Sequence, residues 1–144
     1  MTITENKDKL IAEFSLLSDW ESKYKKIIEM GRQLEDAEDL MQEKLLVKGC
    51  QSQVWLHATQ ENEHIFFRGT SDAMIVKGLL ALLLKIFSGQ KIDDVLQADL
   101  SFVSELGLNV HLSQSRSNGF AAMIKQMKLY AMAFKTMKLH KEHS

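Results

Sequence analysis

Residues 53–68, QVWLHATQENEHIFFR, decide the fold class of this 144-residue chain. Two runs typical of strands, Gln53 to Thr59 and Ile65 to Arg68, flank the polar segment Gln60 to Glu63, which predicts a hairpin turn. A third such run, Leu45 to Lys48, precedes them. Together they predict a small antiparallel sheet of about three strands, a size that persists when a helix covers one face.

Helical patterns precede the strands. Thr2 with Glu5, and Ser18 with Glu21, have capping-box spacing, which predicts that a helix begins at each site. Apolar residues then recur at intervals of three and four, so both helices are expected to be amphipathic. The second helix is expected to end near Gly31, a residue type common at helix C-termini.

Helical patterns also follow the hairpin. The apolar run Met74 to Phe87 predicts a buried helix, and Ile92 to Gln97 and Ser101 to Leu106 predict two short ones. The segment Ser113 to Gly119 leads into a long helix with a basic tail, while the acidic segment Glu35 to Lys44 is expected to form a short exposed turn. This order predicts an α+β domain with helices packed on one side of the sheet.

Length and composition favour one domain spanning residues 1–144, with residues 139–144 as a frayed tail. The 18 basic and 19 acidic side chains nearly cancel, so no bulk field attracts nucleic acid. The most apolar run, residues 74–87, is too short and too charged to span a membrane. A single cysteine excludes an internal disulfide and suits a reducing compartment, and the polar start lacks the apolar core of a signal peptide. A cytoplasmic protein is expected.

The single cysteine, Cys50, lies between strand-forming runs. Gly49 permits a tight bend before it, and Gln51, Ser52 and Gln53 offer it no apolar partner. Free cysteine is among the most buried residue types, whereas an accessible loop thiol can act as a thiolate nucleophile. The residues alone leave a buried, inert cysteine and a reactive one equally open.

Other chemistry has weaker support. The five histidines are scattered, and neither C-x-x-C nor H-E-x-x-H spacing occurs, so no metal and no cofactor is predicted. A Cys–His hydrolytic pair stays open because folding can bring His57 or His111 to Cys50. Arg116, within the segment expected to cap the last helix, makes a modest anion site. Gly78, inside the apolar run, is expected to permit close helix–sheet packing.

Four segments resemble the SufE/CsdE family of sulfur acceptors, the cysteine desulfuration proteins. They are GCQSQVW (residues 49–55), SDAMIVKGLLALLL (71–84), LSQSRSNGF (112–120) and WESKYKKIIEMGRQL (20–34). The cysteine segment is the most specific of the four, and the resemblance covers about residues 14–127. It implies an α+β fold similar to that of the IscU cluster scaffold, without the metal-binding cysteines of IscU.

The resemblance also implies a function. Cys50 would take persulfide sulfur from a cysteine desulfurase of the Suf or Csd kind, stimulate that enzyme, and relay the sulfur to an iron–sulfur cluster scaffold. The desulfurase would use pyridoxal phosphate, while this chain would need no cofactor and would not be a stand-alone enzyme. The matching segments imply a set of residues that face the loop or the partner: Gly49, Gln51, Ser52, Gln53, Asp72, Lys77 and Arg116. The alternatives are an interaction module with an inert cysteine and the Cys–His hydrolase.

Overall fold

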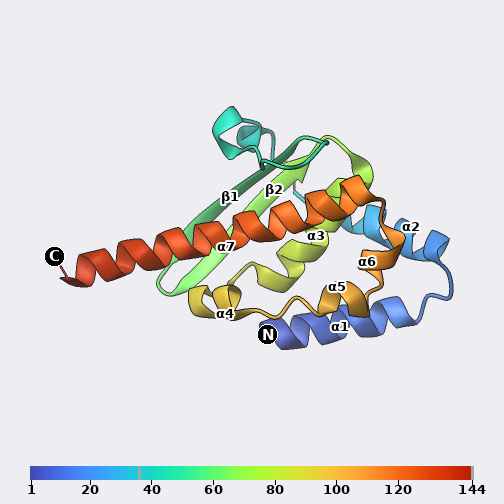
Figure 1. Ribbon diagram of the computed structural model, residues 1–144, viewed down its shortest axis with the longest axis horizontal. Helices are drawn as coiled ribbons and strands as arrows, with labels where there is room; N and C mark the ends of the chain where they lie inside the picture. The colour runs from blue at the N-terminus through green and yellow to red at the C-terminus, as the bar shows by residue number, and fades with distance from the viewer. Residues whose placement is uncertain (36, 144) are drawn as a thin grey trace.

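The computed structural model describes residues 1–35 and 37–143 and has the predicted α+β architecture (Figure 1). Its antiparallel sheet has the order β1-β2-β3, formed by Val54–Glu61, His64–Ser71 and Gln90–Lys91. The α-helices are α1 (Ile3–Ser15), α2 (Trp20–Arg32), α3 (Met74–Phe87), α4 (Ile92–Gln97), α5 (Phe102–Glu105), α6 (Leu108–His111) and α7 (Gln114–His143). Two short 3-10 helices, η1 (Glu38–Leu40) and η2 (Glu43–Leu45), precede the sheet.

The predicted hairpin is confirmed. Strands β1 and β2 pair along their whole length, from Val54 opposite Ser71 to Glu61 opposite His64. The two-residue turn between them places Asn62 at a φ of 58°, in the left-handed region that asparagine tolerates better than most residues. The hairpin therefore extends further at both strands than the runs of β-forming residues indicated.

The prediction of a first strand over Leu45 to Lys48 is wrong. Within it only Leu46 bridges Trp55, and the Val47 N–H donates to Val54 O at 2.8 Å. The 3-10 helix η2 ends at Leu45 and a turn begins at Lys48, so only the residues between them lie extended beside β1. The third strand is instead β3, which pairs with the start of β2 and is too short for a two-residue period to be read from the sequence.

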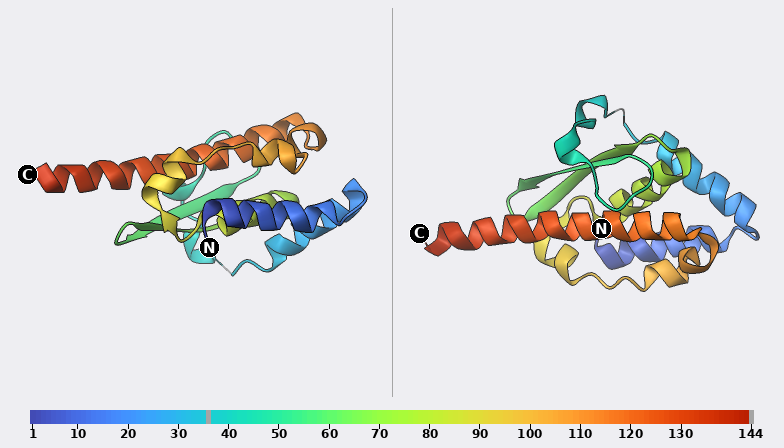
Figure 2. Two further views of the ribbon diagram at one scale, coloured as in Figure 1. Left: turned by 90° about the horizontal axis from the view of Figure 1, so that it is seen from below. Right: turned by 45° about the horizontal axis from the view of Figure 1, so that its top comes forward.

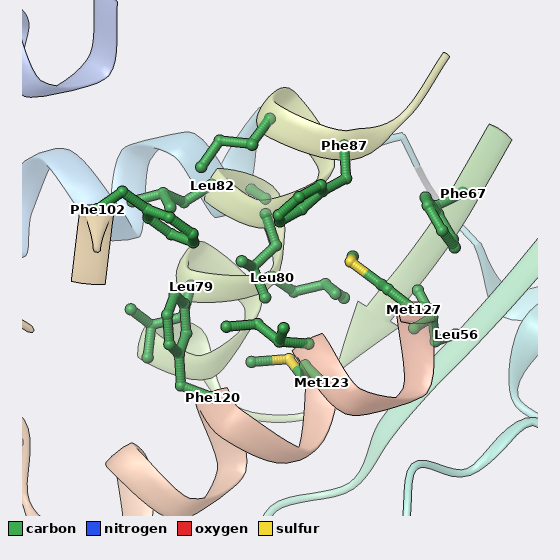
Figure 3. Close-up of a cluster of buried hydrophobic side chains, with 14 of the residues drawn as sticks. Leu56, Phe67, Leu79, Leu80, Leu82, Phe87, Phe102, Phe120, Met123 and Met127 are labelled. Carbon is green, nitrogen blue, oxygen red and sulfur yellow. The ribbon is translucent and has the colours of Figure 1, made fainter. Parts of the chain in front are cut away.

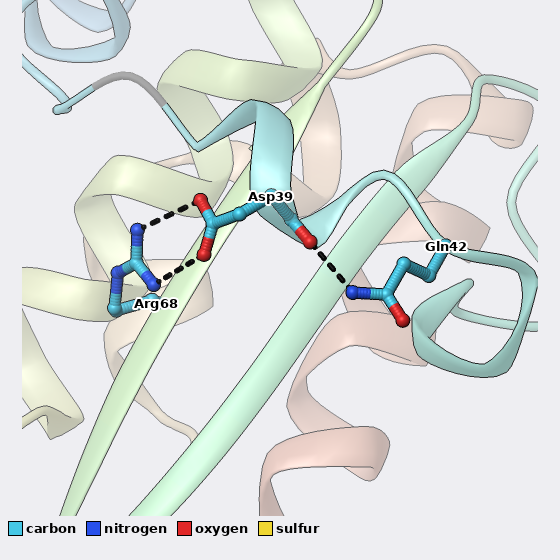
Figure 4. Close-up of polar contacts among 3 residues, drawn as sticks. All are labelled: Asp39, Gln42 and Arg68. Carbon is cyan, nitrogen blue, oxygen red and sulfur yellow. Dashed lines mark hydrogen bonds and ion pairs between the residues drawn. The ribbon is translucent and has the colours of Figure 1, made fainter.

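The segment of residues 37–47, called here the outer-face clasp, packs on the outer face of the sheet. Leu40 is buried beside Trp55, and Asp39 forms two hydrogen bonds with Arg68, at 3.0 and 3.2 Å (Figure 4). These bonds lower the pKa of the Asp39 carboxyl. Gln42 Nε2 donates to Asp39 O at 2.7 Å and steadies the turn. The clasp replaces the single exposed turn expected over Glu35 to Lys44, of which Asp36 lies outside the described residues.

The main core lies on the other face of the sheet, between β1–β2 and the helices α3 and α7 (Figure 3). Leu79, Leu80 and Leu82 of α3 are fully buried. Helix α7 presents apolar side chains at helical spacing to this core: Phe120, Met123, Ile124, Met127 and Ala131. Tyr130 Oη donates to Leu56 O at 2.7 Å, which fastens α7 to β1. The first half of the methionine-rich helix is therefore core.

Helices α2 and α3 cross at two glycines. A Cβ built on Gly78 would lie 2.1 Å from Ile27 O, and one on Gly31 would lie 2.8 Å from the Gly78 nitrogen. Helix α2 ends at Arg32, near Gly31 as predicted, but Gly31 lies inside the helix and is not its cap. The role predicted for Gly78 is wrong, because this glycine admits a helix and not the sheet. Only a residue without a Cβ allows backbones to approach this closely.

Two helix starts also differ from those expected. The cap of α2 is Asp19, whose side chain accepts from Ser22 N, and not Ser18. Helix α7 begins one residue after Ser113, whose Oγ accepts from Arg116 N at 3.3 Å, so the SRSN segment is already helical.

The other end of α7 runs to His143 and projects beyond the rest of the chain (Figure 2). Fraying of residues 139–144 stays a prediction, and Ser144 lies outside the described residues. No helix in the described part of the chain is long and apolar enough to cross a membrane.

Candidate functional site

The loop of residues 48–53 carries Cys50 from the outer-face clasp to the start of β1. Gly49 has a φ of 94°, in the left-handed region that favours glycine, and this turns the chain towards α7. A Cβ at Gly49 would lie 3.4 Å from Ala122 Cβ, so the backbone of the loop approaches the helix closely. The bend predicted at this glycine is therefore present, and it aims the next residue at α7.

The Cys50 thiol is half-buried against the first turns of α7. Its S–H donates to the carbonyl oxygen of Gly119, with Sγ and O 3.6 Å apart. A Cβ at Gly119 would lie 3.6 Å from Sγ, an ordinary contact distance, so the thiol packs directly against this turn of α7. The thiol is therefore neither in the main core nor free in solvent: it is docked on α7.

A cavity of about 240 Å³ adjoins the docked thiol. Three segments line it: the loop with Cys50, Gln51 and Ser52; the start of α3 with Ala73, Ile75, Val76 and Leu79; and α7 with Ser115, Arg116, Gly119, Phe120 and Met123. Arg116 is the ionised side chain at this lining. The α3 residues of the lining are apolar, while the cysteine loop and the start of α7 contribute polar side chains and the Arg116 cation.

Burial raises the pKa of the Cys50 thiol above its ordinary value, because desolvation disfavours the thiolate. The nucleophilic form of cysteine is the thiolate. At neutral pH the docked residue is therefore a protonated thiol, which is a poor nucleophile. Movement of the loop out of the cavity, or a favourable charge from another molecule, would increase the fraction of thiolate.

The far end of the loop is fastened to the turn before α3. Gln53 N donates to Asp72 Oδ1 at 3.0 Å, and Asp72 N donates to Gln53 O at 3.2 Å. Ser71 Oγ donates to the same carbonyl at 2.8 Å. These bonds place Asp72 at the base of the cysteine loop and not at a helix cap. The loop is thus fixed at both ends, with Cys50 between the two attachments.

Three of the candidate residues lie away from the cavity. Lys77 sits on α3 where that helix meets Gly31, and His57 faces Arg68 on the outer face of the sheet. His111 stacks on Trp20, with ring centroids 4.1 Å apart. No histidine, aspartate or glutamate is among the described residues that line the cavity, and the described chain brings no three potential metal ligands together. The geometry gives Cys50 no general base and so does not support the Cys–His hydrolase.

Most lining residues outside the expected set, Gly119 included, lie in the family-like segments 71–84 and 112–120, but nothing in their residue types distinguished them as part of the site. They lie in segments well separated in sequence from Cys50 and carry no chemistry of their own. Gly119 ends the segment that leads into the last helix and also lies in the family-like segment 112–120, with no role expected of it in either. Its contact with the cysteine depends on the packing of α7 across β1, which spacing in the sequence does not reveal.

Docking of the thiol can be tested with Gly119→Leu, whose side chain extends into the space that Cys50 occupies. The thiol pKa is expected to fall towards its ordinary value, because the loop leaves the cavity and the thiolate is resolvated. The rate of alkylation by iodoacetamide, measured against pH, should then reach its midpoint at lower pH and be several-fold faster at pH 7. Gly119→Ala is the control, since its Cβ makes an ordinary contact. Identical pH profiles for Gly119→Leu and the unsubstituted chain would contradict docking.

Comparison with known proteins shows the family and the fold of this chain. A family model, SufE, described as the Fe-S metabolism associated domain, matches residues 8–131. An uncharacterised SufE-like protein of Rhizobium meliloti is 40% identical over 127 residues, covering 84% of this chain and 91% of that protein. The solution structure of a hypothetical protein from Thermus thermophilus has a similar fold, with a TM-score of 0.75, 19% identity and coverage of 91% of this chain and 96% of its own. That last likeness concerns the fold alone.

Proposed function

The chain belongs to the SufE family of Fe-S metabolism associated domains, and on that premise we propose that Cys50 accepts sulfur from a cysteine desulfurase of the Suf or Csd kind. The chain would stimulate that enzyme and pass the sulfur towards iron–sulfur cluster assembly, in the reducing cytoplasm. The observation that carries the proposal is the position of the single thiol, on a loop docked beside a cavity. Membership of the family itself assigns the chain to iron–sulfur metabolism.

The transfer is a thiol exchange at sulfur. The Cys50 thiolate attacks the outer sulfur of a persulfide held on the desulfurase, so a new S–S bond forms at Cys50 while the S–S bond of the donor breaks. The electron pair of the broken bond stays with the donor cysteine, which leaves as a thiolate. The proton lost by Cys50 balances the charge on that thiolate or passes to solvent. No external oxidant or reductant is consumed, and the chemistry of pyridoxal phosphate belongs to the donor.

The docked loop suits a carrier that must avoid side reactions. With its pKa raised by burial, the resting thiol resists oxidation and alkylation. The cavity of about 240 Å³ far exceeds the roughly 30 Å³ that a water molecule occupies in the liquid, so an added sulfur atom fits beside Cys50. A persulfide is anionic at neutral pH, and Arg116 borders the cavity with the opposite charge.

The loop residues around the thiol would meet the donor. Gly49 provides the bend, and Gln51, Ser52 and Gln53 are polar groups able to bond a partner's backbone when the loop moves out. Asp72 would set how readily it moves, since it bonds Gln53 at the loop base. Lys77, in the family's matching segment but away from the cavity, is proposed as a residue of the partner surface only.

The proposal is tested by incubating the chain with a type II cysteine desulfurase, pyridoxal phosphate and cysteine. Intact-protein mass spectrometry should show the gain of one sulfur atom, located at the peptide containing Cys50 and removed by a thiol reductant. Omitting cysteine gives the control. If no sulfur is gained, the proposal fails and an interaction module with an inert cysteine is the remaining alternative.

A further inference from the structure

An apolar groove of about 740 Å³ lies between α7 and the segment that carries α4, α5 and α6. These two parts of the chain run alongside each other in all views (Figures 1 and 2). From Gln114 to Met132, the stretch of α7 that lines the groove is roughly 27 Å long at 1.5 Å per residue. A groove of this length matches a partner helix of about five turns.

The groove exposes side chains that a lone protein would normally cover. Leu129 and Met132 of α7 are 51% and 50% exposed, and Leu100 on the opposite wall is 41% exposed. All three line the groove, so they form one continuous apolar surface and are not scattered singly. Continuous apolar surface of this kind marks an interaction site.

The charges at the groove have one sign. Lys125 and Lys128 line it, and no aspartate or glutamate is among the described lining residues. Lys128 Nζ donates to the carbonyls of Val95, Leu96 and Ala98 at 3.1 to 3.2 Å, which holds the end of α4 against α7. Lys125 is exposed beside the apolar surface. A partner with carboxylates beside its apolar side chains complements this groove, whereas the basic end of a second copy's α7 does not.

The groove and the cysteine cavity share one buried lining residue. Phe120 lines both the groove and the cysteine cavity, which lie on opposite sides of the first turns of α7. A protein that delivers sulfur to Cys50 contacts one side of those turns, and the groove lies within reach of the same protein on the other side. A standard interface buries roughly 800 Å² on each partner and is anchored by apolar side chains. The cysteine loop is small and polar, whereas the groove offers a larger apolar surface for such an anchor.

We propose that the desulfurase docks in this groove with an amphipathic helix, whose apolar side chains cover Leu129 and Met132 and whose carboxylates face Lys125. The inference rests on the proposed function and adds to it a second docking surface, separate from the cysteine loop. Contacts in the groove strengthen the binding of the desulfurase, and the loop carries the cysteine that reacts with its persulfide. Loss of the groove should weaken the complex without changing the reactivity of Cys50.

The test uses Leu129→Glu and Met132→Glu, which place a carboxylate in the groove. Met137→Glu is the matched control, because Met137 is on the same helix and 54% exposed but does not line the groove. Titration of the resting desulfurase by calorimetry should give a Kd about tenfold or more higher for each groove variant, and within about twofold of the unsubstituted chain for the control. Lys125→Glu should weaken the complex and reduce its dependence on salt, whereas Lys9→Glu on α1 should not. Circular dichroism checks that each variant is folded.

Sulfur acceptance separates this inference from the proposed function. With saturating desulfurase, the groove variants should still gain one sulfur atom at Cys50. If the unsubstituted chain accepts sulfur and the groove variants bind as tightly as it does, the groove inference is overturned and the proposed function stands. Equal weakening by Met137→Glu, or a groove that instead mediates self-association in sedimentation experiments, also overturns the inference. If the unsubstituted chain neither binds the desulfurase nor gains sulfur, both proposals fail.

Discussion

Replacing Cys50 by serine is expected to abolish sulfur acceptance and the stimulation of the desulfurase while leaving the fold intact. Cys50 is the only thiol in the chain, so no other side chain can form a persulfide. A serine hydroxyl can still donate to Gly119 O, and the free energy of unfolding should change by about 1 kcal/mol or less. Intact mass after reaction and the rate of alanine production by the desulfurase measure the two effects.

A thiol placed elsewhere serves as the matched control for this prediction. In the double variant Cys50→Ser with Thr59→Cys, the new thiol lies on an exposed part of β1, away from the cysteine loop. It should alkylate faster than docked Cys50 and yet gain no sulfur from the desulfurase, because acceptance needs the loop and not a thiol alone. Sulfur gain by the double variant at the rate of the unsubstituted chain would show that the position of Cys50 carries no function.

The hairpin and the main helices could be predicted because their residue patterns repeat over enough positions to be recognised in the sequence. Val54 to Glu61 and His64 to Ser71 are each eight residues, and the apolar positions of α3 recur through fourteen. The third strand could not be, since Gln90–Lys91 is a strand only because β2 lies beside it. The failed strand at Leu45 to Lys48 has strand-forming residues, but the clasp uses Leu45 and Leu46 to cover Trp55. Tertiary packing overrode local propensity there.

Only the cysteine loop of the candidate site could be predicted from the sequence, and not the helices against which it packs. The loop glycine and polar neighbours distinguished Cys50 in the sequence, yet they left burial and reactivity equally open. The structure shows why both descriptions applied: the thiol is half-buried, but on a loop that contacts α7 at Gly119 and Ala122. The wall that docks it comes from α3 and α7, and the approach of Gly119 depends on how these helices pack. No spacing within the loop encodes that contact.

Among substitutions of a single glycine by alanine in this chain, Gly78→Ala is expected to cause the largest loss of stability. The new Cβ would lie 2.1 Å from Ile27 O and 2.6 Å from Ile27 Cγ2, and one of these contacts is with backbone that cannot rotate away. Helices α2 and α3 must therefore separate, which opens gaps around buried Ile27 and Leu79. Overpacking typically costs about 1–3 kcal/mol, and the upper end is expected here because the obstacle is backbone. This cost exceeds the gain of roughly 0.5–1 kcal/mol from replacing a helical glycine.

Thermal and urea unfolding measure this effect, and Gly119→Ala is the matched control within another helix. A fall in Tm on the order of 10 °C is expected for Gly78→Ala. In Gly119→Ala the Cβ meets Cys50 at 3.6 and 4.0 Å, an ordinary contact, so stability should rise by roughly 0.5–1 kcal/mol. The difference between the two variants separates close helix approach from helix propensity, because both add the same methyl group to a helix. Equal Tm values would mean that the crossing of α2 and α3 adapts to a side chain, and that the contact of Gly31 with Gly78 is not required for the fold.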